Sequence, residues 1–191
     1  MELTTARTIA EGLVELARPA CSRIEIAGSI RRSKPNVKDI ELVAIVNDYD
    51  LLYKNLATAG RFIKPGVPDI IDWAPKADAK YIRMLINDNI KLDLFVAHEE
   101  NWGPLYMMRT GGAVGADGNA FNGFVPGMFA RWKKISGGGK MVGCMPTMPD
   151  GLQLVCPEEQ DFFELLEMDF VPPGERVDRK VIKKYIRKSA N

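Results

Sequence analysis

The sequence is short of the residues that build disulfide frameworks and zinc sites. It has three cysteines, Cys21, Cys144 and Cys156, without a Cys-x-x-Cys pair, and one histidine, His98. An odd cysteine count argues against a disulfide framework, and the scarcity of cysteine and histidine ligands argues against a structural zinc site. With 191 residues, of which 46 % are hydrophobic, the chain is long enough to bury a core of its own.

Long apolar runs are also missing. No uninterrupted stretch approaches the roughly 18 apolar residues that a membrane-spanning helix needs. The first residues, Met1 to Thr5, lack the basic and apolar regions of a secretory signal. We therefore expect a cytoplasmic protein, or a nuclear or viral one, that is not secreted, engages no membrane and is a monomer by default.

Charge is balanced overall but unevenly distributed. The net charge is +1, yet the segment 176–191 contains seven basic residues and one acid, Asp178. A basic segment of this kind is typical of a surface that meets a polyanion, and lysines that only solvate a helix end give the same pattern. Both interpretations stay open at the level of charge alone.

The spacing of apolar residues predicts an α/β protein. Its first part is expected to contain helices over residues 3–17 and 51–59, strands over 24–27 and 40–46, and a hairpin of strands 81–86 and 90–96. Its second part is expected to contain helices over 128–134 and 162–166 and a strand over 152–156. The glycine-rich stretch 111–127 indicates a sharp bend or a close approach to a ligand.

Three acidic residues are placed to act together. Asp39 and Glu41 are two residues apart at the start of a predicted strand, so their side chains point to one face. Asp93 alternates with Leu92 and Leu94 on a second predicted strand and is displayed on a sheet face. Carboxylate oxygens of this kind suit Mg²⁺, and the set predicts a two-metal phosphoryl-transfer site.

The loop before the acidic pair supports that interpretation. Gly28 permits close backbone approach, Ser29 offers a hydroxyl and an amide, and Arg32 can bind phosphate oxygens with two parallel hydrogen bonds. Together they form a candidate triphosphate cradle. Without this loop, the three acids would be interpreted as unrelated surface charges.

At these residues the chain resembles the family X DNA polymerases of the nucleotidyltransferase superfamily. The resemblance rests on Gly28-Ser29-Ile30-Arg31-Arg32, on the step from Gly28 to Asp39, and on Asp93. It continues in Met108-Arg109-Thr110-Gly111, where the family has an aromatic pair and Thr-Gly, and in Phe170-Val171-Pro172-Pro173-Gly174-Glu175-Arg176. The chain begins at the first helix of the palm, like minimal viral members, so no lyase activity is expected.

The resemblance implies a fold, a site and a reaction. The fold is an α/β (α+β) nucleotidyltransferase palm over residues 1–100, with a mixed sheet flanked by helices. Residues 101–191 form a smaller α+β subdomain that binds nucleotide and DNA and ends in the basic tail. Catalysis and the binding of two Mg²⁺ ions, with Mn²⁺ as an alternative, fall to Asp39, Glu41 and Asp93. Nucleotide binding falls to Gly28, Ser29, Arg32, Thr110 and Gly111.

The implied activity is a DNA-directed DNA polymerase that adds a nucleotide from a dNTP to a DNA 3′-hydroxyl, on primer–template or gapped DNA, as in gap-filling repair. Phosphate contacts with DNA are expected from the basic tail and from Arg131, Lys133, Lys134 and Lys140. Phe129 and Trp132 either stack on a base or fill the core.

Departures from the family pattern keep a second hypothesis open. Glu41 stands where the polymerases usually have aspartate, as in nucleotidyltransferases that modify antibiotics. Lys91 stands in place of an arginine, and Met108 and Arg109 replace the aromatic pair. The alternative is a stand-alone nucleotidyltransferase that acts on RNA, a protein or a small molecule.

Overall fold

The polypeptide forms two units in the computed structural model, Met1–Ala97 and His98–Asn191. The structure describes residues 1–64, 66–67 and 72–188, so the last three residues of the basic tail lie outside the described part. The boundary expected from the sequence was between residues 100 and 101. Each unit has its own hydrophobic core and is described separately below.

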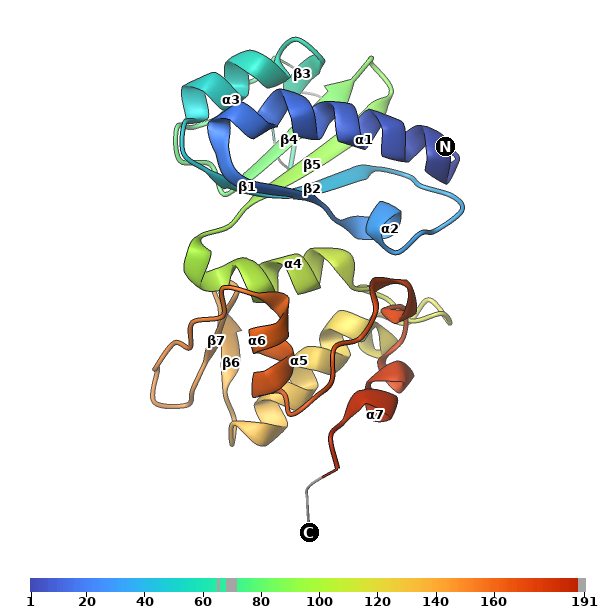
Figure 1. Cartoon of the computed structure of the whole chain (residues 1–191), viewed down its shortest axis with the longest axis vertical. Coiled ribbons are helices and arrows are strands. Elements are labelled where there is room, and N and C mark those ends of the chain that lie inside the picture. Colours follow the sequence, from blue (N-terminus) through green and yellow to red (C-terminus); the bar gives the residue numbers. More distant parts are fainter. Residues whose placement is uncertain (65, 68–71, 189–191) are drawn as a thin grey trace. The chain divides into compact units, whose positions relative to one another are not determined.

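The first unit is built on a five-stranded sheet of order β1-β2-β5-β4-β3. Strands β2 and β5 are parallel, and the other neighbouring pairs are antiparallel. The elements are α1 (Leu3–Ala17), η1 (Arg18–Ala20), β1 (Cys21–Ile26), α2 (Gly28–Arg31), β2 (Ile40–Val46), α3 (Tyr49–Leu56), β3 (Gly60–Ile63), β4 (Tyr81–Ile86) and β5 (Ile90–Val96). The predicted α/β architecture, a mixed sheet flanked by helices, is confirmed (Figure 1).

The first helix forms because apolar residues recur on one side of it. Ala6, Ala10, Leu13, Val14 and Ala17 are buried at helical spacing, and Pro19 follows in the short 3₁₀ turn η1. Helix α3 begins two residues earlier than predicted, because Asp48 caps it: its Oδ1 accepts a hydrogen bond of 2.9 Å from the amide of Leu51. Both helices lie against the same face of the sheet (Figure 1).

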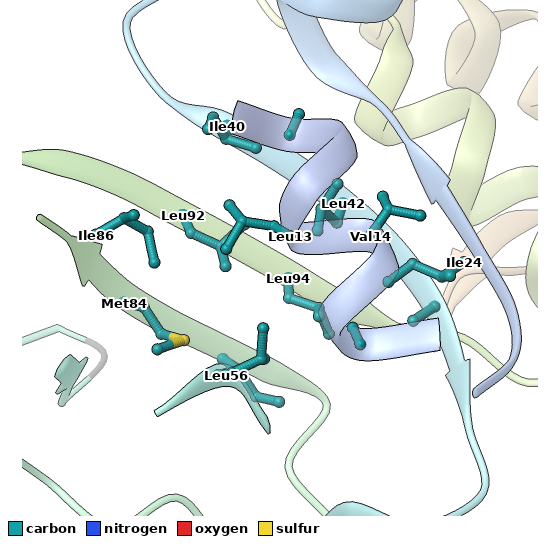
Figure 2. Packing of buried hydrophobic residues seen from close by; sticks show 14 of the residues in the cluster. Leu13, Val14, Ile24, Ile40, Leu42, Leu56, Met84, Ile86, Leu92 and Leu94 are labelled. Atoms are coloured by element: carbon teal, nitrogen blue, oxygen red, sulfur yellow. The ribbon is translucent and has the colours of Figure 1, made fainter. Parts of the chain in front are cut away.

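Alternation along the strands separates an apolar face of the sheet, which packs against the helices, from a face that carries charged side chains as well as Val43 and Phe95. Leu42 of β2, Leu92 and Leu94 of β5 and Met84 of β4 pack in the core beneath Leu13 of α1 (Figure 2). Glu41, Asp93 and Arg83 alternate with these leucines and methionine, so they lie on the opposite face. The core of the first unit therefore fixes which side chains face away from the helices.

The predicted hairpin of β4 and β5 is confirmed, with the predicted bounds. Its turn contains Asn87 and Asp88, with φ angles of 47° and 60°. Asparagine and aspartate adopt this left-handed conformation more readily than most residues, which explains a tight turn at this point. The turn sets the register and pairs Arg83 with Asp93 across the two strands.

The second unit combines helices with a two-stranded sheet, β6 with β7. Its elements are η2 (Glu99–Asn101), α4 (Trp102–Thr110), η3 (Ala120–Asn122), α5 (Phe124–Ile135), β6 (Lys140–Val142), β7 (Met145–Thr147), α6 (Glu159–Leu165), η4 (Pro173–Glu175), η5 (Arg179–Val181) and α7 (Ile182–Tyr185). Phe124, Met128, Trp132, Phe162 and Phe163 form the centre of its core. Trp132 is therefore a core residue, 3 % exposed, and Phe129 packs against the same cluster.

The strand predicted over residues 152–156 is wrong. Strands form instead on either side of a turn at Gly143 and Cys144, whose φ angles are 56° and 64°. In the predicted segment, Leu152 and Val155 are 59 % and 56 % exposed, and only an isolated bridge joins Gln153 to Thr147. Only part of the segment is covered: Cys156 is buried and Leu154 packs against the core of the second unit, whereas Leu152 and Val155 stay exposed.

Within residues 1–64, 66–67 and 72–188, no helix combines the length and the apolar character that crossing a membrane would require.

Candidate active site

Gly28 brings the loop after β1 against the carboxylate of Glu41. The chain leaves β1 at Ala27, whose amide donates a hydrogen bond of 2.8 Å to the carbonyl of Glu41. Gly28 then adopts a φ of +60°, and a Cβ placed there would lie 2.0 Å from Oε2 of Glu41. Glycine is required both for this backbone conformation and for the space that the carboxylate occupies.

Ser29 and Arg32 follow in the single turn of α2, beside the acidic pair. The Oγ of Ser29 is enclosed and has no hydrogen-bond partner in the described part of the chain. Burial lowers the pKa of the Arg32 guanidinium, while the nearby Glu41 and Asp39 act in the opposite direction and favour its charged form. A hydroxyl with unused hydrogen-bonding capacity therefore lies one helical turn from a guanidinium whose charged form two carboxylates favour.

These residues line one pocket of about 500 Å³ on the first unit. Four predicted site residues, Ser29, Arg32, Asp39 and Glu41, contribute to its wall. The wall is completed by Lys34, Pro35, Asn36 and Lys38. The two lysines add positive charge around the same space, as a polyphosphate would require.

Asp93 lies beside Glu41, and its carboxylate is held by the next strand. The parallel register pairs Glu41 of β2 with Asp93 of β5, and Asp93 is 6 % exposed. The hydroxyl of Tyr81 donates to Oδ1 of Asp93 over 2.6 Å. Arg83 donates from Nε to Oδ1 over 2.7 Å and from Nη2 to Oδ2 over 2.8 Å. Both donors come from β4, which flanks β5 on the side opposite β2.

This pairing shifts the pKa values of both partners of Asp93. The hydrogen bond to Asp93 is the main cause that raises the pKa of Arg83, so the guanidinium stays charged. Burial, followed by the hydrogen bond to Asp93, raises the pKa of Tyr81 and keeps its phenol protonated. Neither residue belongs to a motif in the sequence, although the predicted hairpin places residue 83 opposite residue 93.

The donor set fits hard divalent cations in its chemistry. Asp39 and Glu41 offer carboxylates at the pocket, and the missing Cβ of Gly28 leaves the space that the Glu41 carboxylate needs. Among the residues that the structure describes, however, no three histidine, cysteine, aspartate or glutamate side chains lie close enough to hold one ion. Glu41 and Asp93 are therefore neighbours on one sheet face, and Asp39 lines the pocket just before β2, without the three forming a closed ligand cluster.

Thr110 and Gly111 lie in the second unit, at the end of α4. Thr110 is buried, and the amide of Gly111 donates to the carbonyl of Met107 over 2.8 Å. A Cβ at Gly111 would lie 2.7 Å from Cγ2 of Val125 and 2.8 Å from Cδ1 of Phe124. Close packing against α5 explains the glycine, and the nucleotide-binding role of both residues stays a prediction.

Two of the basic residues expected to contact DNA phosphates make contacts within the second unit, and for the fully buried Arg176 the prediction is wrong. Arg176 is fully buried, and its Nη1 lies 2.6 Å from Oε1 of Glu159. Arg131 donates from Nε to the carbonyl of Leu166, just after α6. Both guanidinium groups are used to stabilise the second unit, whereas Lys133, Lys134 and Lys140 are exposed.

Compared with known proteins, the chain matches no family model and no curated protein. The resemblance to family X DNA polymerases therefore stays a prediction from its motifs and from the arrangement of residues 28–41 and 93.

Proposed function

We propose that the chain is a metal-dependent nucleotidyltransferase of the family X DNA polymerase type, which adds a nucleoside monophosphate from a dNTP to a DNA 3′-hydroxyl. One observation carries the proposal. Ser29, Arg32, Asp39 and Glu41 line a single pocket, with Asp93 in register beside Glu41. Phosphoryl transfer needs hydrogen-bond donors to the phosphate and cation-binding carboxylates in one place.

Each residue has a role in this proposal. The hydroxyl of Ser29 donates a hydrogen bond to a phosphate oxygen of the triphosphate, and Arg32 binds the same group with two donors. Asp39 and Glu41 would hold two Mg²⁺ ions, and Asp93 would complete the ligand set on the side of the attacking hydroxyl. When bound, such ions neutralise the phosphate charge and favour ionisation of the hydroxyl. Lys34 and Lys38 hold the polyphosphate chain at the rim of the pocket.

A smaller acceptor than DNA is the second candidate. Arg131 and Arg176 are engaged inside the second unit, which leaves fewer arginines for a duplex than the sequence indicated. The pocket of the first unit needs no duplex-binding surface to bind a triphosphate. A nucleotidyltransferase that modifies RNA, a protein or a small molecule would use the same five residues, Ser29, Arg32, Asp39, Glu41 and Asp93.

Primer extension separates the two candidates. The chain is incubated with single-stranded, recessed and one-nucleotide-gapped DNA, with labelled dNTPs or rNTPs, and with Mg²⁺ or Mn²⁺. We expect extension of the gapped or recessed primer. Label that enters RNA, protein or a small molecule, with no extension of any primer, would instead support the second candidate.

Asp39→Asn tests whether the activity belongs to the pocket. Loss of one metal-binding carboxylate is expected to lower the extension rate on the order of a thousandfold. Asp88→Asn is the matched control, because Asp88 is exposed in the β4–β5 turn and asparagine tolerates its φ of 60°. If Asp39→Asn retained the wild-type rate, the proposed site would be wrong.

A further inference from the structure

Arg83 donates two hydrogen bonds to the carboxylate of Asp93, which the proposed site needs as a metal ligand. Both of its hydrogen bonds to Asp93 are short, 2.7 and 2.8 Å, and Tyr81 adds a third of 2.6 Å. A carboxylate offers about four acceptor sites in total. Three are used by β4, and both sites on Oδ1 are among them.

Arg83 holds the Asp93 carboxylate on the side away from Glu41, so this pairing works against a metal ion bound by both Asp93 and Glu41. Strand β5 lies between β2 and β4, so Glu41 is on one side of Asp93 and Arg83 on the other. The charge of Arg83 also repels any cation placed at the same carboxylate. Asp93 therefore cannot serve Arg83 and a divalent cation fully at the same time.

We infer that Arg83, supported by Tyr81, competes with divalent cations for Asp93 and so sets the affinity of the site for metal. This inference rests on the proposed function, and it adds two residues, Arg83 and Tyr81, to the site. Arg83 acts through Asp93 and is a positioning residue. Cation binding draws the Asp93 carboxylate from Arg83 toward Glu41.

The exposure of the two side chains permits this exchange. The Asp93 side chain is 9 % exposed, whereas that of Arg83 is 32 % exposed. A guanidinium with this much access to water can lose one partner without becoming a buried, unpaired charge. Asp93 cannot, so it needs either Arg83 or a cation as its partner.

The test compares Mn²⁺ binding by the full chain and by its variants. Binding is measured from the electron paramagnetic resonance signal of the unbound ion. Arg83→Met removes the competing charge and is expected to bind Mn²⁺ about tenfold more tightly than the wild type. Tyr81→Phe removes one hydrogen bond and is expected to bind about threefold more tightly. Its ring, stacked on Phe95 with centroids 5.0 Å apart, is retained.

Thermal unfolding supplies a second readout that a purely structural role would not give. Without added metal, Arg83→Met should unfold at a lower temperature than the wild type, because Asp93 has lost its partner. Saturating Mn²⁺ should then raise its unfolding temperature more than that of the wild type, because the cation replaces the lost partner.

Arg61→Met controls for the change in net charge. Arg61 lies on β3 of the same sheet and pairs with the exposed Asp88 over 2.6 Å. The Arg61→Met substitution removes one positive charge, as Arg83→Met does, and leaves the contacts of Asp93 unchanged. Its Mn²⁺ affinity should equal that of the wild type.

The outcomes separate this inference from the proposed function. Wild-type binding of Mn²⁺ with equal or weaker binding by Arg83→Met would overturn the competition and leave the proposed function standing. If neither protein bound Mn²⁺, both would be overturned. If Arg83→Met did not fold, Tyr81→Phe would decide: tighter binding than the wild type supports the competition, and unchanged or weaker binding overturns it.

Discussion

Two arginine–carboxylate pairs, one in each unit, use the same chemistry in different surroundings. The Arg176 and Glu159 side chains are 0 % and 7 % exposed, and the guanidinium lies over the rings of Phe163 and Phe170. The Arg83 and Asp93 side chains are 32 % and 9 % exposed, on the sheet face that also carries Glu41. Aromatic rings contact both pairs, since Arg83 lies over Tyr81, but only the second pair is partly exposed and has an acidic neighbour, Glu41.

This difference separates a structural pair from one that can exchange partners. Arg176 also donates from Nε to the carbonyl of Val171 over 2.8 Å, so it fixes the segment before η4 as well as α6. A buried ion pair is expensive to break because the remaining partner keeps an uncompensated charge. A half-exposed arginine is less constrained, since water can solvate it when its carboxylate turns elsewhere.

Replacing each of the two arginines in turn is expected to give the largest difference in stability between the two pairs. Arg176→Met removes the guanidinium from the buried carboxylate of Glu159, and we expect it to lower the free energy of unfolding by about 3–5 kcal/mol. Arg83→Met should lower it less, because its pair is partly exposed. Urea denaturation of both variants measures the difference.

The double variant Arg176→Met with Glu159→Gln is the control for this prediction. It removes both charges, so it should regain part of the stability that Arg176→Met loses. If Arg176→Met and Arg83→Met lost the same free energy of unfolding, the two pairs would not differ as proposed, with one structural and the other able to exchange its partner.

Gly28→Ala tests whether the pocket depends on close approach rather than on backbone freedom alone. The added methyl group meets Oε2 of Glu41 and the φ of +60° is strained, so we expect a loss of about 2–3 kcal/mol of stability together with most of the activity. Gly137→Ala is the matched control: its φ is +69°, but nothing lies within 4 Å of the new Cβ. Strain alone should lower its stability by about 1 kcal/mol.

Local signals in the sequence were sufficient for much of the first unit. The hairpin over 81–96 follows from alternation and from Asn87 and Asp88 at its turn, and the helix over 3–17 follows from helical spacing. Glu41 and Asp39 could be grouped because they are two residues apart, and both line the pocket although β2 begins only at Ile40. These features depend on neighbours a few residues away, which a single sequence displays.

Long-range partners could not be predicted in the same way. Arg176 belongs to a basic run that indicates an exposed tail, and nothing near it in the sequence identifies Glu159, 17 residues earlier, as its buried partner. The segment 152–156 has the composition of a strand, yet it is joined to β7 only by an isolated bridge between Gln153 and Thr147. Burial and pairing are properties of the assembled core, so local pattern assigned both segments wrongly.

Arg32→Lys examines the guanidinium of the pocket, whose charged form Glu41 and Asp39 favour. Lysine keeps the charge but loses the pair of parallel donors, so we expect the KM for the triphosphate to rise about tenfold with a smaller change in kcat. Arg31→Lys is the control, because Arg31 does not line the pocket. Equal effects at the two positions would remove Arg32 from the triphosphate cradle.

The smallest effect is expected on the surface of the second unit, where the exposed lysines contrast with the buried Arg176. Lys183 and Lys184 are exposed on α7, and replacing both with glutamine should weaken binding of gapped DNA about threefold at low salt. If each lysine contacts one phosphate, the slope of log affinity against log salt should fall by about 2. Lys54→Gln with Lys64→Gln makes the same charge change on the first unit, and its slope should stay at the wild-type value. A slope that is unchanged in the α7 variant would mean that these lysines only solvate the helix, and DNA contacts would then have to come from Lys133, Lys134 and Lys140.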